Sequence, residues 1–292
     1  MDNQTITLSD GRALGFQELG DPDGSPLFFF HGTPGSRLVL SSNDRIAQIP
    51  GIRLILPERP GYGLSDPQPG RVLLDWPDDI TELADYLGLD MFAVSGESGG
   101  GPHTLACAYR LPHRVTMALV LSSPAPAGFK GARRGMSSGN RLGLVLNRYA
   151  PWLVRRIIRS SASAFERDPD RFIDALARQM APPDQALLAD TPLRQAIIRD
   201  FREAYRQGSD GQAVDGALAV TSRTWGFSLR DIAVPVFLWH GEADTLVPIT
   251  MARHLASEIP HCKACFIAGA GHLLTEHPAV IAEVEKVLGR RG

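Results

Sequence analysis

MFAVSGESGGG, residues 91–101, joins a short apolar run to a helical pattern through a turn rich in glycine. Its centre, residues 96–100, fits the pattern G-x-S-x-G. In this pattern the serine occupies a sharp, strained turn with its hydroxyl exposed, and larger side chains at the flanking glycines would collide with strand or helix. A phosphate-binding loop is the alternative, but the chain has neither G-K-[ST] nor G-x-G-x-x-G at this turn. The stretch therefore predicts a nucleophilic serine, Ser98, directly after a core strand.

Apolar runs bounded by Gly or Pro recur on both sides of this turn and alternate with helical patterns. Nearly continuous apolar runs are typical of parallel strands that are covered on both faces. The predicted strands are Thr5–Leu8, Ala13–Glu18, Leu27–Phe30, Ile52–Leu56, Met91–Ser95, Met117–Ser122, Val234–Trp239 and Cys265–Ala268. The predicted helices between them are Pro77–Leu87, Gly99–Arg110, Thr250–Glu258 and Pro278–Leu288. This alternation predicts a doubly wound, mostly parallel α/β sheet, which binds ligands at the carboxyl ends of its strands.

The middle of the chain has a different composition. Residues 130–208 hold 15 Lys/Arg and 8 Asp/Glu, a balance of +7 in a chain whose net charge is −2. Helical patterns at Pro151–Arg159, Phe165–Met180 and Pro192–Gln207 indicate a helical insertion that splits the α/β core. Its arginines either line the entrance of a pocket and favour acidic substrates or cover the outer helix faces in water.

A nucleophilic serine needs a base, and a carboxylate must orient that base. His272 follows the last predicted strand in a Gly-Ala-Gly-His loop, whereas His240 opens a turn and is the weaker candidate for the base. No Asp or Glu occurs between Ser98 and Phe165, so the acid must come later in the chain. Asp244 follows the strand Val234–Trp239, and the order Ser98, Asp244, His272 is the one expected after this kind of turn. Glu242 is the competitor for the acid.

Hydrolysis of an acyl bond also needs donors for the oxyanion of the tetrahedral intermediate. The amide of Gly99, next to the nucleophile, is one predicted donor. The second comes from HGTPG, residues 31–35, which follows the strand Leu27–Phe30. Because proline has no amide hydrogen, Thr33 is the predicted donor in this loop.

Five segments together identify the chain as similar to the α/β-hydrolase superfamily: HGTPG (31–35), ERPGYGLS (58–65), GESGGG (96–101), WHGEADTLVP (239–248) and GAGH (269–272). The resemblance implies an eight-stranded sheet, a core of residues 1–124 and 230–292, and a helical cap at 125–229. It implies nucleophile, acid and base roles for Ser98, Asp244 and His272, and oxyanion donors in Thr33 and Gly99. Two positions depart from the family pattern: Glu58 replaces the usual Asp, and Glu97, which Arg59 could neutralise, precedes the nucleophile.

The expected activity is hydrolysis of a small carboxylic ester through an acyl-enzyme on Ser98, without a cofactor. A lactonase, a C–C bond hydrolase or a small-molecule receptor of the same fold stay open as alternatives. A proline iminopeptidase would carry HGGPG rather than HGTPG, and an epoxide or haloalkane hydrolase would carry Asp in place of Ser98.

Composition excludes other classes of function. The net charge of −2 gives no electrostatic case for nucleic-acid binding, and no apolar run reaches the ~18–20 residues of a membrane span. No signal peptide is evident, so a cytoplasmic enzyme with a small-molecule acyl substrate and no stable membrane association is expected. Cys262 and Cys265 resemble a metal motif but lack further ligands, so no metal is expected. Residues 152–159 could lie on a membrane surface, but a cap helix with its apolar side over the active site and its arginines in water is expected instead.

Overall fold

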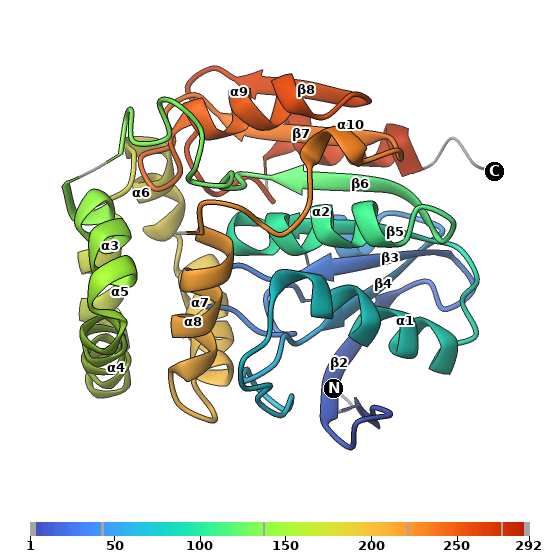
Figure 1. The fold of residues 1–292 in the computed structure, drawn as a ribbon, viewed down its shortest axis with the longest axis horizontal. Coiled ribbons are helices and arrows are strands. Elements are labelled where there is room, and N and C mark those ends of the chain that lie inside the picture. The colour runs from blue at the N-terminus through green and yellow to red at the C-terminus, as the bar shows by residue number, and fades with distance from the viewer. Residues whose placement is uncertain (1–3, 42–43, 137, 221, 276, 289–292) are drawn as a thin grey trace.

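The described strands form one eight-stranded sheet. The structure is a computed structural model that describes residues 4–41, 44–136, 138–220, 222–275 and 277–288. The strands are β1 (Gln4–Thr7), β2 (Ala13–Gly20), β3 (Ser25–Phe30), β4 (Ile52–Pro57), β5 (Phe92–Glu97), β6 (Val115–Leu121), β7 (Val236–Gly241) and β8 (Cys262–Ile267). Their order in the sheet is β1-β2-β4-β3-β5-β6-β7-β8 (Figure 1).

The sheet is antiparallel at one edge and parallel elsewhere. β2 pairs antiparallel with both β1 and β4, while the pairs from β4 through β8 are parallel. The predicted mostly parallel sheet is therefore confirmed. The predicted position of the last strand is shifted, because β8 already begins at Cys262 rather than at Cys265.

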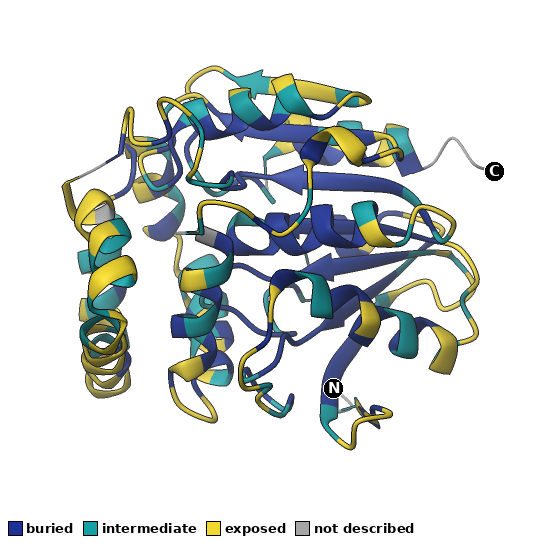
Figure 2. Cartoon of the chain, viewed as in Figure 1, coloured by how far each residue is buried: buried dark blue, intermediate teal, exposed yellow. Residues whose placement is uncertain are grey.

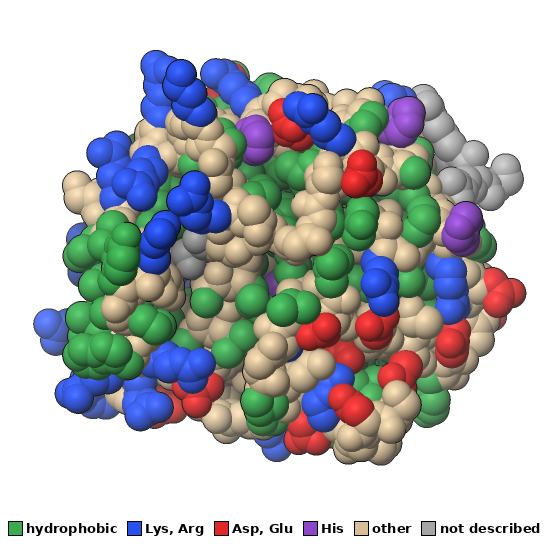
Figure 3. Space-filling view, in the orientation of Figure 1, with side chains coloured by type: hydrophobic (Ala, Val, Ile, Leu, Met, Phe, Trp, Pro, Cys, Tyr) green, Lys and Arg blue, Asp and Glu red, His purple; other side chains and the backbone are tan. Residues whose placement is uncertain are grey.

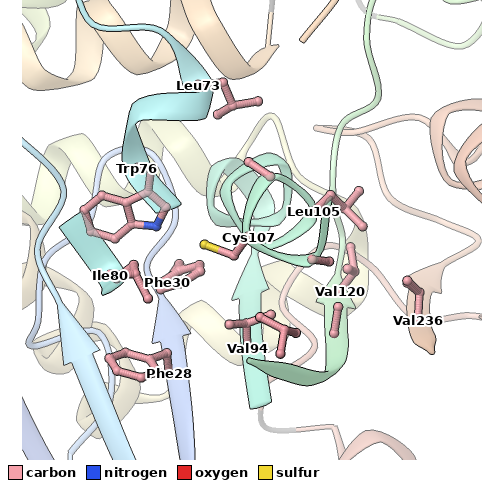
Figure 4. Close-up of a cluster of buried hydrophobic side chains, with 14 of the residues drawn as sticks. Phe28, Phe30, Leu73, Trp76, Ile80, Val94, Leu105, Cys107, Val120 and Val236 are labelled. Atoms are coloured by element: carbon pink, nitrogen blue, oxygen red, sulfur yellow. The ribbon is translucent and has the colours of Figure 1, made fainter. Parts of the chain in front are cut away.

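Helices cover both faces of the sheet, which makes it doubly wound. The helices outside the middle segment are α1 (Trp76–Tyr86), α2 (Gly101–Arg110), α9 (Ile249–Glu258) and α10 (Pro278–Leu288). On one face Phe28, Phe30 and Val94 of the sheet pack with α1 and α2 (Figure 4), and α9 adds side chains to the same apolar cluster. On the other face Leu54 and Leu119 pack with α10. The central strands β4, β5, β6 and β7 are accordingly buried almost throughout their length, whereas the edge strands β1 and β8 are partly exposed (Figure 2).

Between β6 and β7 the chain leaves the sheet and forms a layer of helices at one end of it (Figure 1). These helices are α3 (Ser138–Tyr149), α4 (Pro151–Arg167), α5 (Pro169–Ala177), α6 (Pro182–Leu188), α7 (Thr191–Ala204) and α8 (Asp210–Asp215), followed by a π-helical turn at Gly216–Val220. Of these, α4, α5, α6 and α7 share a small apolar core that includes Phe165, Ile173 and Ile198. We call α3–α8 the inserted helices.

One predicted helix in this segment is wrong. Phe165–Met180 is not continuous, because α4 ends at Arg167 and α5 starts at Pro169. Asp168 separates them, and its carboxylate accepts a hydrogen bond of 3.0 Å from the backbone N–H of Arg171. An aspartate N-cap followed by proline in the first turn is a strong helix start, so the chain begins a new helix here.

The outer surface of the inserted helices is rich in arginine and also exposes apolar side chains (Figure 3). Trp152 and Ile157 of α4 are 63% and 51% exposed, and the arginines between them are exposed as well. The prediction that residues 152–159 turn their apolar side toward the active site is therefore wrong for these two side chains. Within the described part of the chain, no helix is both long and apolar enough to cross a membrane.

Candidate active site

Ser98 stands at the turn between β5 and α2 in a conformation that few non-glycine residues adopt. Its φ is +48°, in the left-handed region, and it begins a short 3₁₀ turn. A side chain at Gly96 would place its Cβ 2.5 Å from Thr104 Oγ1, and one at Gly100 would place it 2.1 Å from the carbonyl oxygen of Phe30. Helix α2 lies too close to Gly96, and the end of β3 too close to Gly100, to leave room for a side chain. Both glycines of G-x-S-x-G are thus required, as the sequence predicts.

His272 and Asp244 come together from two loops at the carboxyl end of the sheet. His272 lies in the loop between β8 and α10, and its Nδ1 is 2.7 Å from Asp244 Oδ2. Asp244 follows β7, and its other oxygen accepts hydrogen bonds from the backbone N–H groups of Leu246 (2.8 Å) and Val247 (2.9 Å). These bonds fix the carboxylate, so its second oxygen is held toward the imidazole.

The two groups shift each other's pKa. Burial alone lowers the pKa of His272, but the charge of Asp244 and their hydrogen bond outweigh it, and the pKa ends above its ordinary value. Burial raises the pKa of Asp244, but the charge of His272 and the hydrogen bonds reverse the direction, and the pKa ends below its ordinary value. The pair therefore favours an anionic carboxylate beside a basic imidazole.

The competing candidates are placed less well. His240 is fully buried; its Nε2 is 2.9 Å from the carbonyl oxygen of Val247 and 3.4 Å from Asp244 Oδ2, farther than His272 Nδ1, and burial lowers its pKa. Glu242 is 44% exposed and lies 3.7 Å from the guanidinium of Arg253. The geometry thus brings Asp244, rather than Glu242, to His272.

The loop HGTPG lies against the nucleophile turn. A Cβ at Gly99 would lie 3.3 Å from the amide nitrogen of Thr33, and a Cβ at Gly32 would lie 3.7 Å from Ser98 Cβ. Arg59 holds this loop: it donates to the carbonyl oxygens of His31 (2.5 Å) and Gly32 (2.7 Å) and to Thr33 Oγ1 (3.2 Å). Thr33 and Gly99 are therefore neighbours.

The sequence suggests Arg59 as a partner for Glu97, but this pairing is wrong. Arg59 pairs instead with a carboxylate of the inserted helices. Its Nε donates to Asp215 Oδ2 at 2.7 Å, and Arg71 donates to the other oxygen of Asp215. Arg59 and Asp215 are both fully buried. Burial raises the pKa of Asp215, but the charges of the two arginines reverse this and hold it far below its ordinary value. Sequence analysis missed Asp215 because no local pattern marks it.

Replacing Asp215 by alanine is expected to destabilise the fold by about 3–5 kcal/mol, because it leaves two buried guanidinium groups without their carboxylate. Urea denaturation monitored by circular dichroism measures this change. Asp210→Ala is the matched control on the same helix: its carboxylate is exposed and lies 3.7 Å from Arg155, so its loss should cost less than about 0.5 kcal/mol. Equal stability of the two variants would contradict this assignment.

Ser98, His272 and Thr33 line one cavity of about 600 Å³ beneath the inserted helices. Among the described residues, the side chains of Ser98 and His272 are not joined by a hydrogen bond. In enzymes without bound substrate, a bond between nucleophile and base is often long and shortens only when substrate binds. The wall is mainly apolar and comes from several inserted helices. It includes Phe172, Leu176, Leu187, Leu188, Leu193, Ile197 and Phe201, together with Leu246 and Leu273 from the core.

The charged residues of this wall are acidic apart from His272. Asp44, Glu97 and Asp200 line the cavity, and no Lys or Arg does so within the described residues. Asp200 is buried and accepts bonds from the N–H (2.8 Å) and hydroxyl (2.6 Å) of Ser36, and burial raises its pKa to about 8. The arginines of the inserted helices thus lie away from this wall. The described residues also contain no cluster of three or more His, Cys, Asp or Glu that could hold a metal ion.

Comparisons with known proteins agree with this architecture. The family model of the alpha/beta hydrolase fold matches residues 25–276. The uncharacterized hydrolase YcgS of Bacillus subtilis is 27% identical over 277 residues, which covers 93% of this chain and 92% of that protein. The bifunctional esterase/perhydrolase DCH of Acinetobacter calcoaceticus is 25% identical and covers 87% of each chain. A non-heme chloroperoxidase of Streptomyces lividans is 27% identical and covers 95% and 96%.

Solved structures share the fold along the whole chain. A thermophilic esterase from Thermogutta terrifontis superposes with a TM-score of 0.69 at 21% identity and covers 99% of both chains. The esterase RhEst1 from a Rhodococcus superposes with a TM-score of 0.70 at 21% identity and covers both chains completely. Together with the family match, the sheet order and the turn at Ser98, these likenesses show that the chain belongs to the α/β-hydrolase family.

Proposed function

We propose that this α/β hydrolase is a serine carboxylesterase, with Ser98 as nucleophile, His272 as base and Asp244 as the acid that orients His272. The observation that carries the proposal is the 2.7 Å bond from His272 to Asp244 in a cavity that Ser98 also lines. Esterase names among the relatives support the same reaction class.

In the proposed reaction the roles follow from which atoms are already occupied. His272 Nδ1 is bonded to Asp244, which leaves Nε2 to take the proton of the Ser98 hydroxyl. The serine oxygen then attacks the ester carbonyl, and the amides of Gly99 and Thr33 stabilise the oxyanion. The imidazolium returns its proton to the leaving alcohol, and an acyl-enzyme on Ser98 forms. Water, deprotonated by His272, then releases the carboxylic acid and restores the serine.

We infer that the substrate is an uncharged ester with an apolar group of moderate size. A mainly apolar wall of about 600 Å³ favours such a group through burial of its surface. The carboxylate of Glu97, whose negative charge also acts on His272, disfavours an anionic group there, whereas Asp200, with its pKa raised to about 8, is mainly uncharged at pH 7. Two like unit charges about 8 Å apart repel by about 2 kcal/mol at an effective dielectric of about 20.

We predict that the neutral p-nitrophenyl methyl succinate is hydrolysed with at least a tenfold higher kcat/KM than anionic mono-p-nitrophenyl succinate, because only the second brings a negative charge to the acidic wall. Release of p-nitrophenolate measures both rates. Glu97→Gln is the matched variant, since it removes one carboxylate at constant size. It should lower the ratio of kcat/KM for the neutral ester to kcat/KM for the anionic ester. An equal or faster rate for the anionic ester would contradict the proposed substrate class.

Other substrates separate the alternatives, with lactone hydrolysis measured by the acid that it releases and diketone cleavage by the loss of its absorbance. A panel of p-nitrophenyl esters, an acyl lactone and a vinylogous diketone distinguishes an esterase from a lactonase and from a C–C bond hydrolase. A protein that binds these compounds but turns none of them over would be a receptor, and the esterase proposal would then be wrong.

A further inference from the structure

Asp184 belongs to α6 of the inserted helices but directs its carboxylate at the loop of His272. It is only 1% exposed. Its Oδ2 accepts a hydrogen bond of 2.9 Å from the backbone N–H of His272, and its Oδ1 accepts one of 2.9 Å from that of Leu273. The two oxygens therefore each hold one of two successive backbone amides, in a segment that is 88 residues away along the chain.

The ordinary role of an acidic residue here would be to cap its own helix. Asp184 occupies the third position of α6. From this position an acidic side chain can accept a hydrogen bond from the backbone N–H of the N-cap residue. The cap position, Ala181, has no side chain that could do so. The carboxylate nevertheless bonds the His272 loop, so its contacts serve that loop and not the start of α6.

The His272 loop is shaped to receive this carboxylate. A Cβ at Gly271 would lie 2.1 Å from Asp184 Oδ2, so only glycine allows the approach. On the other side of the histidine, the hydroxyl of Ser122 donates to the carbonyl oxygen of His272 at 2.7 Å. The backbone of His272 is thus held at its N–H by the inserted helices and at its C=O by the end of β6.

Asp184 also acts on the imidazole through its charge. Burial lowers the pKa of His272, while the charges of Asp244, Glu97 and Asp184 raise it, with Asp244 contributing most of the three. These are the acidic groups that act on the imidazole from the core, the nucleophile turn and the inserted helices. A buried carboxylate that fixes the backbone and adds charge can affect both the direction and the basicity of the histidine.

We propose that Asp184 is a positioning residue for His272: from the inserted helices it clamps the amides of His272 and Leu273, so that Nε2 is aimed at Ser98. This inference rests on the proposed serine hydrolase function. It makes the inserted helices a part of the catalytic scaffold, because the contact that holds the N–H of His272 exists only when α6 is packed against the core.

The test is Asp184→Asn, which keeps the size of the side chain but replaces one accepting oxygen by an N–H₂ group. One backbone N–H of the loop then loses its acceptor. We expect kcat for a neutral p-nitrophenyl ester to fall at least tenfold while KM changes less than about twofold, because the wall that binds the substrate is untouched. The acid limb of the kcat/KM profile should move down by roughly half a pH unit, since a negative charge near the imidazolium is lost.

The matched control is Asp190→Asn. Asp190 is also a carboxylate of the inserted helices that accepts a backbone N–H, that of Leu193 at 3.4 Å, but it is exposed and caps its own helix. The variant Asp190→Asn should leave kcat and the pH profile of kcat/KM unchanged. A loss of kcat in Asp184→Asn without a shift of the acid limb, or an equal loss in Asp190→Asn, would overturn the positioning role.

A second readout does not depend on activity. Proton NMR titration of the His272 imidazole, assigned by its absence in His272→Gln, gives the pKa directly in each variant. A lower midpoint in Asp184→Asn supports the inference even in a protein that hydrolyses no ester, and an unchanged midpoint overturns it. Failure of the esterase proposal would instead appear as absence of turnover in the unmodified protein.

Discussion

Ser98→Ala should lower kcat for a neutral p-nitrophenyl ester by at least about 10⁴-fold, because the hydroxyl that forms the acyl-enzyme is gone and only binding and the oxyanion donors are left. The fold should persist. Ser98 adopts a φ of +48°, and alanine has a smaller side chain at the same strained turn. Initial rates and thermal melting measure the two effects.

The control for this variant is Ser95→Ala, three residues earlier in β5. Ser95 is fully buried in the strand, so its loss should leave kcat near that of the unmodified protein. If Ser98→Ala kept more than one tenth of the kcat of the unmodified protein, Ser98 would be excluded as the nucleophile.

Asp244→Asn should lower kcat by about 10⁴-fold, because an amide can no longer hold His272 with its proton on Nδ1 and with Nε2 free for Ser98. The loss of the charge should also lower the pKa of His272, since Asp244 is the largest of the groups that raise it. The acid limb of any residual activity therefore moves to lower pH.

Glu242→Gln is the matched control, since it removes a carboxylate only two residues away. Glu242 pairs with Arg253 at the surface, so the change should leave kcat within about twofold. If Glu242→Gln were the damaging change and Asp244→Asn were not, the assignment of the acid would be wrong.

The parts of the site that the sequence predicts are those whose requirement is local. Gly96 and Gly100 are needed by contacts within one turn and the strand beside it, so the G-x-S-x-G pattern alone indicates them. Asp244 and His272 each directly follow a strand, and the doubly wound topology brings such positions to one edge of the sheet. The geometry of these residues matches the prediction, while their catalytic roles stay predictions.

Other parts depend on contacts between distant segments. Asp184 and Asp215 bond partners that are 88 and 156 residues away, and neither stands in a pattern that would reveal it. The position of the arginines also needs the packed helices, since the sequence shows their excess but not which helix face meets the cavity. By contrast, the break between α4 and α5 had a local signal in Asp168 and the proline that follows it.

The most direct test of the central proposal is to identify the nucleophile by covalent labelling. The protein is incubated with one equivalent of an aryl phosphonate ester, whose phosphorus a reactive serine attacks with release of the aryl alcohol, and its peptides are then analysed by mass spectrometry. We expect one phosphonyl group per chain, on the hydroxyl of Ser98, with loss of esterase activity in the same proportion. Inactivation with the adduct on another residue, or an esterase that acquires no adduct on Ser98, would contradict it.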